Sequence, residues 1–146
     1  MERAGMKLNA ASILKIMFIV GAVVDGVIAA TWFLIASGIE IPNILNGYTG
    51  SGPEYQLTMY IAAMFMSGWT ILLIWGALKP VERRDLLLIT AALLIISVVV
   101  ELVFYGSMLG GGGFVFGVTK RLLISTAALA AYFYSFVNLK KIPDTR

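Results

Sequence analysis

The chain has 146 residues, of which 60% are hydrophobic and only 13% are charged. A soluble domain carries about 25% charged residues, so this composition indicates that much of the surface faces lipid. The sequence contains neither cysteine nor histidine, which excludes disulfides, thiol chemistry and the commonest ligands of haem and zinc. We therefore expect no metal site, no cofactor and no catalytic residue, and the net charge of +3 does not suggest a nucleic-acid partner.

Four long apolar segments follow one another along the chain. A helix needs roughly 20 apolar residues to cross the hydrocarbon core of a membrane, and continuous apolar runs of this length are not typical of β-strands. The expected helices cover residues 11–37, 55–78, 86–109 and 114–137. We predict a single all-α transmembrane domain over residues 1–146, an integral membrane four-helix bundle in which helices adjacent in sequence are antiparallel.

Basic residues are distributed unevenly around these segments. Nine of the eleven Lys and Arg residues lie in the termini, early in the first helix or in the turn at 79–85, whereas the loop at 38–54 has none. Short segments rich in Lys and Arg stay on the cytoplasmic side of a membrane. We therefore predict a multi-pass protein of the cell (cytoplasmic) membrane, with both termini inside and the loop at 38–54 outside.

Each expected helix has one face of small and polar residues, while its other positions are mostly large and apolar. Small side chains allow membrane helices to approach closely, and hydroxyl groups can hydrogen-bond across the contact. Four such faces would meet in a polar seam through the bundle. The hydroxyl residues that we assign to this seam are Ser67, Thr70, Ser97 and Ser125.

Two acidic and two basic residues lie inside the expected spans, namely Asp25, Glu101, Lys120 and Arg121. A charge at the bilayer centre costs roughly 2.5–3.5 kcal/mol, so each of these side chains needs a partner. Folding the last two helices about the glycine run at 110–113 brings Glu101 to the depth of Lys120 and Arg121. Two interpretations remain: a structural ion pair, for which the planar guanidinium of arginine is well suited, or the lining of a hydrated pocket that opens outward.

Asp25 is harder to explain, because the sequence places no cation at its depth. Lys15 is ten residues away on the same helix, which corresponds to about 15 Å. A buried structural acid, hydrogen-bonded to a hydroxyl or reached by Arg121, fits the sequence as well as an acid that binds a proton or a ligand.

One block of the chain comprises GWTILLIW, KPVERR and LLLIT at 68–75, 79–84 and 86–90. It resembles a block in small four-span prokaryotic membrane proteins of unknown function and covers about a sixth of the chain. The resemblance implies a prokaryotic cytoplasmic membrane and no particular activity. The segment at 21–25, which ends in Asp25, is similar to the acidic first helix of the small multidrug resistance transporters. The long first loop and the Lys120–Arg121 pair depart from that family, so its mechanism is not transferred.

Three functional classes are compatible with these features. We favour a non-enzymatic bundle that binds a lipid-like or apolar molecule, or a partner membrane subunit, through its seam, because the charges of the seam balance. The alternative is a proton-coupled small-molecule transporter or channel that acts as an oligomer and uses Asp25 and Glu101. A lipid-modifying enzyme comes last, because the chain lacks histidine and any known nucleophile motif. Membrane lipids, a second copy of the chain or another membrane subunit are the expected partners.

Overall fold

A computed structural model describes residues 9–41, 50–106 and 112–139. Its elements are α1 (Ala10–Ala36), α2 (Pro53–Leu78), α3 (Asp85–Val100), the π-helical turn η1 (Glu101–Tyr105) and α4 (Gly112–Leu139). The predicted all-α four-helix fold is confirmed, and the helices begin and end close to the expected residues. The predicted end of the third helix, at 109, and residues 42–49 of the loop at 38–54 fall outside the described residues.

Short local signals determine where the helices begin. The side chain of Asn9 accepts a hydrogen bond from the backbone N–H of Ala11 and caps α1. Pro53 occupies the first turn of α2, where its missing N–H has no intrahelical partner to lose. Asp85 lies in the first turn of α3, where a carboxylate interacts favourably with the helix dipole. The ends of the helices therefore follow from the residues that flank the apolar runs.

All four helices, with α3 extended through η1, are long and apolar enough to cross a membrane. Large apolar side chains cover the outside of the bundle; examples are Val27, Phe65, Ile71, Val103 and Leu123, all of which are exposed. An exterior of this kind is unfavourable in water and favourable against lipid chains. The described residues therefore form a multi-pass membrane bundle.

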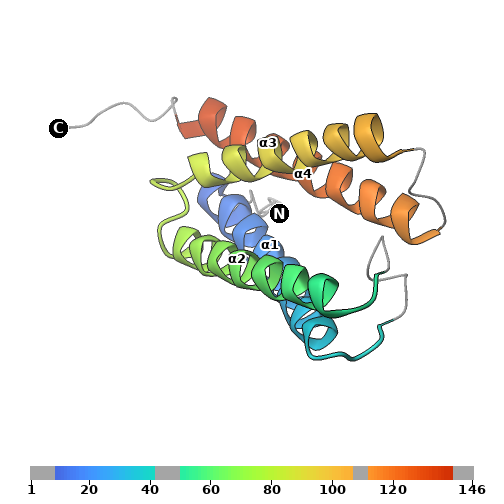
Figure 1. The fold of residues 1–146 in the computed structure, drawn as a ribbon. Coiled ribbons are helices and arrows are strands. Elements are labelled where there is room, and N and C mark those ends of the chain that lie inside the picture. Colours follow the sequence, from blue (N-terminus) through green and yellow to red (C-terminus); the bar gives the residue numbers. More distant parts are fainter. Residues whose placement is uncertain (1–8, 42–49, 107–111, 140–146) are drawn as a thin grey trace, which may run out of the picture.

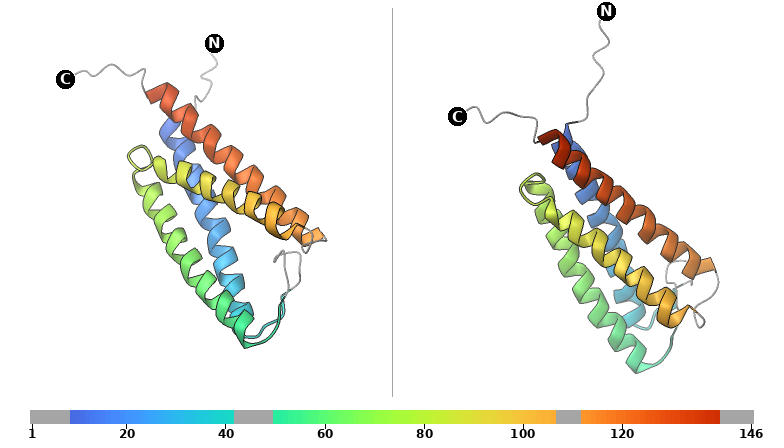
Figure 2. Two further views of the ribbon diagram at one scale, coloured as in Figure 1. Left: turned by 45° about the horizontal axis from the view of Figure 1, so that its top comes forward. Right: turned by 90° about the horizontal axis from the view of Figure 1, so that it is seen from above.

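The four helices form two pairs (Figure 1). α1 packs along α2, α3 packs along α4, and α1 also contacts α4. Although only a short turn joins α2 to α3, these two helices diverge from it and scarcely touch (Figure 2). α2 directs Gly76 toward Phe18 of α1, and its bulky Phe65 and Trp69 line a cavity together with residues of α3. The short turn thus sets the antiparallel direction, while side-chain size determines which helices pack closely.

The bundle is tightly packed at the end that carries the turn at 79–84. Every helix contributes to the apolar core there, whose buried members are Leu14, Phe18, Ala22, Leu73, Ala77, Leu87, Ala91, Ala128 and Ala131. Gly76 is required by this packing, because a Cβ atom at that position would overlap the ring of Phe18. Small residues on several helices therefore allow close approach at this end.

Two arginines attach the turn at 79–84 to the helices around it. The guanidinium of Arg83 lies 3.5 Å from the ring centroid of Trp75 and donates a hydrogen bond to the Trp75 carbonyl. Arg84 lies 5.4 Å from the ring of Phe136 and 5.9 Å from that of Tyr132. Since Phe136 and Tyr132 belong to α4, these cation–π contacts link the turn to the last helix and help to close this end.

Candidate functional site

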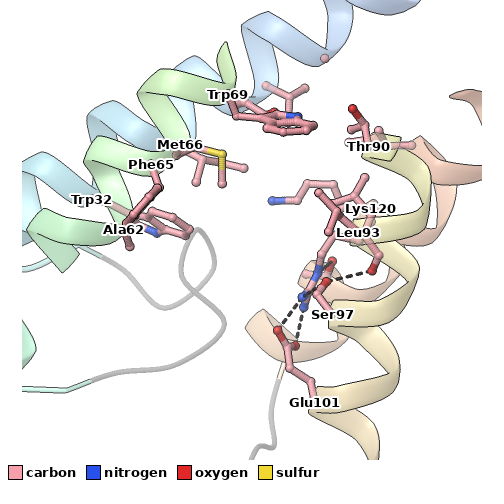
Figure 3. Close-up of a pocket in the computed structure, with 18 of the residues that line it drawn as sticks. Trp32, Ala62, Phe65, Met66, Trp69, Thr90, Leu93, Ser97, Glu101 and Lys120 are labelled. Carbon is pink, nitrogen blue, oxygen red and sulfur yellow. Dashed lines mark hydrogen bonds and ion pairs between the residues drawn. The ribbon is translucent and has the colours of Figure 1, made fainter. Parts of the chain in front are cut away.

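At the opposite end the helices separate around a cavity of about 570 Å³, which residues of all four helices line (Figure 3). This volume is within the range of small-molecule sites in proteins, roughly 300–1,000 Å³. Most of the wall is apolar, and its aromatic members are Trp32, Phe65, Trp69 and Phe114. Asp25, Glu101, Lys120 and Arg121 lie in the same wall. The cavity therefore brings together all four charged residues that the sequence placed within the spans.

Glu101 and Arg121 form a two-pronged ion pair at the edge of this cavity. Nη1 and Nη2 of Arg121 each lie 2.5 Å from one carboxylate oxygen of Glu101. Arg121 also donates to Oγ of Ser97 and, through Nε, to the carbonyl of Gly117, both at 3.2 Å. The two charged side chains are only 17% and 19% exposed. The guanidinium is therefore held in one orientation from three directions, which a planar donor group makes possible.

The local structure of both helices supports this pair. Glu101 is the first residue of η1, where the α-helical hydrogen-bond pattern of α3 gives way to a π-helical turn. Turns of this kind are rare and occur frequently at functional sites. On α4, Gly117 lies one turn before Arg121, and a Cβ there would lie 3.7 Å from Nη2 of Arg121, an ordinary contact. Both departures from a regular leucine-rich helix lie at the ion pair.

Asp25 and Lys120 line the cavity from α1 and α4, respectively. No ion pair links them, and Asp25 accepts no hydrogen bond from any described residue. The side chain of Lys120 extends into the cavity (Figure 3), and its ammonium lies 5.9 Å from the ring of Phe116. Lys120 is the cation that acts electrostatically on Asp25. The sequence placed no cation at the depth of Asp25, whereas in the structure α4 packs against α1 and brings Lys120 to the same cavity.

The four predicted seam hydroxyls do not form one continuous network. Ser97 lines the cavity and accepts a hydrogen bond from Arg121. Ser67, Thr70 and Ser125 each donate to a carbonyl of their own helix, at 2.7–2.9 Å, and none of the three lines the cavity. Helical Ser and Thr often bond in this way to the preceding turn. Among these hydroxyls, only Ser97 links two helices, and the seam is small and apolar elsewhere.

The aromatic wall of the cavity was not assigned to a site from the sequence. Phe65 and Trp69 are four residues apart on α2 and therefore share one face of the helix. This spacing is the signal that could have identified the wall, but it is indistinguishable from that of a lipid-facing stripe until the position of α3 is known.

The wall of the cavity carries both charged and apolar groups. Within the described ranges, no three side chains of the metal-binding types come close enough together to hold an ion. The wall offers two carboxylates, an ammonium and a guanidinium that is already engaged, set among indole, phenyl and aliphatic groups. Such a wall can accept a charged or polar group together with an apolar group on one molecule.

Comparison with protein-family models, with curated proteins and with solved structures finds no match for this chain. The two resemblances drawn from the sequence stay predictions. The function is therefore argued from the cavity and from the residues in its wall.

Proposed function

We propose that this protein is a non-enzymatic membrane protein that binds an amphipathic molecule between its two helix pairs. The observation that carries the proposal is the cavity of about 570 Å³, in which apolar walls surround Asp25, Lys120 and the Glu101–Arg121 pair. Sites for small molecules are mostly apolar, with a few polar groups that orient the ligand. An amphipathic ligand would place its apolar part against the rings and its polar group near the charges.

The gap between α2 and α3 supplies a route into this site. These helices scarcely touch, and the lining residues Phe65 on α2 and Leu93 on α3 are 78% and 50% exposed. In a membrane, side chains at such a gap face lipid chains. A ligand that is already dissolved in the bilayer could therefore enter sideways and keep its tail in the hydrocarbon region.

The proposal includes an orientation in the cell membrane. With both termini and the turn at 79–84 in the cytoplasm, the cavity lies in the outer half of the bilayer. Arg83 and Arg84, which stack on aromatic rings at the packed end, support this placement because short loops rich in basic residues stay on the cytoplasmic side. A green fluorescent protein fused to the C-terminus should be fluorescent and an alkaline phosphatase fused there inactive. The reverse pattern would contradict the orientation.

The binding function can be tested by blocking the cavity. Ala62 lines it and is half-buried, so Ala62→Phe should place a ring inside the ligand volume. Native mass spectrometry of protein released from dodecyl maltoside micelles should show bound lipid or detergent on the wild-type protein and much less on Ala62→Phe. Met64→Phe is the matched control, because Met64 is exposed on the same helix. Equal amounts of bound amphiphile on all three proteins would refute the proposed function.

One observation favours the alternative of a proton-coupled transporter or channel. Asp25 lies in the wall of a cavity within the membrane span and has no ion-pair partner among the described residues, and unpaired acids within membrane spans often carry protons. Under this alternative, proteoliposomes should show a proton flux that Asp25→Asn abolishes. A flux that survives Asp25→Asn would exclude Asp25 from proton coupling.

A further inference from the structure

We infer that the polar group of the ligand is zwitterionic, with its cation bound beside Asp25, Trp32 and Trp69 and its anion bound by Lys120. This inference rests on the proposed binding function and specifies its ligand class. The molecule would carry both charges on one head group and an apolar tail. The distribution of charges in the cavity is what would select such a head group, because an apolar cavity alone would not.

The four charged side chains of the cavity divide into a satisfied pair and an open pair. Glu101 and Arg121 neutralise each other through two short hydrogen bonds. Asp25 and Lys120 lie in the same wall but form no ion pair with each other. In a low-dielectric site an uncompensated charge is unfavourable, so a ligand that carries opposite charges would satisfy both members of the open pair at once. A ligand with a single charge would leave one of them uncompensated.

The surroundings of Asp25 suit a cation. Gly26 on α1 faces Thr70 on α2, since a Cβ at Gly26 would lie 3.6 Å from the Thr70 methyl group. The adjacent residues Asp25 and Trp69 therefore lie at similar depth, and both line the cavity. Trp32 is seven residues after Asp25, two turns along the same face of α1. A carboxylate with indole rings nearby is the combination that binds ammonium groups, through charge and through cation–π contact.

The surroundings of Lys120 suit an anion. The neighbouring Arg121 already donates to Glu101, Ser97 and Gly117, whereas the ammonium of Lys120 projects into the open space of the cavity (Figure 3). An ammonium offers three donors that can reorient toward an incoming oxygen. Lys120 is therefore the cation of this wall that is placed to meet a phosphate or carboxylate group of a ligand.

The apolar part of the ligand has a separate path. Phe65 and Leu93 lie on the two helices that diverge, and both are largely exposed as well as part of the cavity wall. A tail that leaves the head group between α2 and α3 would contact these side chains and then the surrounding lipid. A zwitterionic phospholipid and a soluble zwitterion carry the same two charges, but only the phospholipid has an apolar tail that could follow this path.

A competition experiment tests the inference. Wild-type protein in dodecyl maltoside is mixed with equal amounts of dodecylphosphocholine, dodecyl phosphate and dodecyltrimethylammonium, and bound adducts are compared by native mass spectrometry. The three probes share one tail and differ in head-group charge. We expect dodecylphosphocholine to exceed dodecyl phosphate and dodecyltrimethylammonium, whose head groups carry charge of only one sign, about ten-fold, the effect of one charged hydrogen bond. Glycerophosphocholine, which has no tail, should compete only weakly if the source is lipid; equal competition by it would assign the site to a soluble zwitterion.

Two variants assign the two charges. Asp25→Asn should remove the preference for dodecylphosphocholine over dodecyl phosphate, and Lys120→Gln should remove its preference over dodecyltrimethylammonium. Glu54→Gln and Lys79→Gln change the same charges outside the cavity and should keep the wild-type order of adducts. Retained binding of dodecyl maltoside by Asp25→Asn and Lys120→Gln shows that both variants are folded.

The outcomes separate the inference from the function on which it rests. One outcome is that the wild-type protein binds dodecyl maltoside as strongly as dodecylphosphocholine, with both blocked by Ala62→Phe. That result would overturn the inference of a zwitterionic ligand and leave the binding function intact. A single preferred charge, or a preference that neither cavity variant changes, would also overturn it. Wild-type protein that retains no amphiphile at all would refute the binding function itself.

Discussion

The two ends of this bundle are built from the same kinds of helix but are held together differently. At the end near the turn at 79–84, small residues allow the helices to close around Phe18 and Leu73, and two arginines stack over aromatic rings. At the other end, α2 and α3 diverge, and a charged pair together with a cavity takes the place of the apolar core. The packed end is thus closed by an apolar core, whereas the hollow end is held by an ion pair beside open space that a ligand could occupy.

Side-chain size accounts for much of this difference. On α2, Gly76 and Ala77 belong to the half that packs and Phe65 belongs to the half that opens, whereas Trp69 lies at the border, where it packs against the core and also lines the cavity. Large rings that point between the helix pairs prevent their close approach, and the charges in the cavity favour contact with a ligand or water over contact with aliphatic groups. The two halves of one helix thus have different roles, and substitutions in each half should have different consequences.

The largest expected effect comes from breaking the ion pair at the hollow end. Arg121→Met would leave the carboxylate of Glu101, which is 17% exposed, without its partner, and the loss of one member of a buried pair costs about 3–5 kcal/mol. Unfolding in detergent, followed by circular dichroism, should show this loss. The double variant Glu101→Gln/Arg121→Met should recover a large part of it.

An exposed ion pair provides the control for that prediction. Lys79 and Glu82 lie 3.0 Å apart in the solvent-facing turn, with side chains more than half exposed. Pairs of this kind contribute about 0–1 kcal/mol, so Lys79→Gln should change stability very little. An Arg121→Met variant that is as stable as Lys79→Gln would show that the Glu101–Arg121 pair does not hold the hollow end together.

Two adjacent alanines on α2 sharpen the comparison of packed and open surfaces. Ala63 is fully buried, whereas its neighbour Ala62 is half-buried in the cavity wall. Ala63→Phe should destabilise the bundle by about 1–3 kcal/mol, the usual range for overpacking, while Ala62→Phe should stay within roughly 0.5 kcal/mol of the wild type. Thermal unfolding of both variants in the same detergent tests this. Equal destabilisation would mean that the cavity is filled by packed side chains.

At the packed end, Gly76→Ala should lower stability by about 1–2 kcal/mol, because the added Cβ would overlap the ring of Phe18. Gly68→Ala is the matched control on the same helix, since nothing lies within 4 Å of a Cβ there. That control should be neutral or stabilising by up to about 1 kcal/mol, from the higher helix propensity of alanine. The midpoint of chemical unfolding should therefore be lower than that of the wild type for Gly76→Ala and equal to or higher than it for Gly68→Ala. Identical midpoints would contradict the close approach of α1 and α2.

The smallest effect is expected at the turn. Arg84→Gln removes the cation–π contacts with Tyr132 and Phe136, each of which is worth about 0.5–1 kcal/mol at exposed sites. The melting temperature should fall slightly, and binding of amphiphiles at the distant cavity should be unchanged. A loss of binding in Arg84→Gln would mean that the two ends are coupled more tightly than the packing suggests.

The sequence predicts the features of this fold that depend on local properties. Each helix could be located because an apolar run of sufficient length is a property of one segment. The contact between Glu101 and Arg121 was also within reach, because it follows from counting residues away from the turn between α3 and α4. Which residues of two consecutive helices lie at the same depth depends only on the single connection between them, so it can be predicted from the sequence.

The cavity was less predictable, because it depends on which helices pack together. Nothing in the order of the chain shows that α1 contacts α4 and so brings Lys120 to the same wall as Asp25. The separation of α2 from α3 likewise depends on the sizes of side chains that face each other across the bundle. The predicted network of hydroxyl groups between helices was wrong for Ser67, Thr70 and Ser125, which donate hydrogen bonds to carbonyls of their own helices. The position of a hydroxyl on a helical face does not show which of these two kinds of hydrogen bond it forms.

Accessibility of the hollow end tests the account most directly, and the absence of cysteine from the chain makes it simple to measure. Ser97→Cys and Ser135→Cys are conservative replacements; Ser97 lines the cavity, whereas Ser135 is fully buried near the packed end. A water-soluble maleimide should modify Ser97→Cys in the folded protein and leave Ser135→Cys unmodified until the protein is unfolded in sodium dodecyl sulfate. Equal protection of the two thiols would show that both ends of the bundle are closed, and would contradict a binding cavity between the helix pairs.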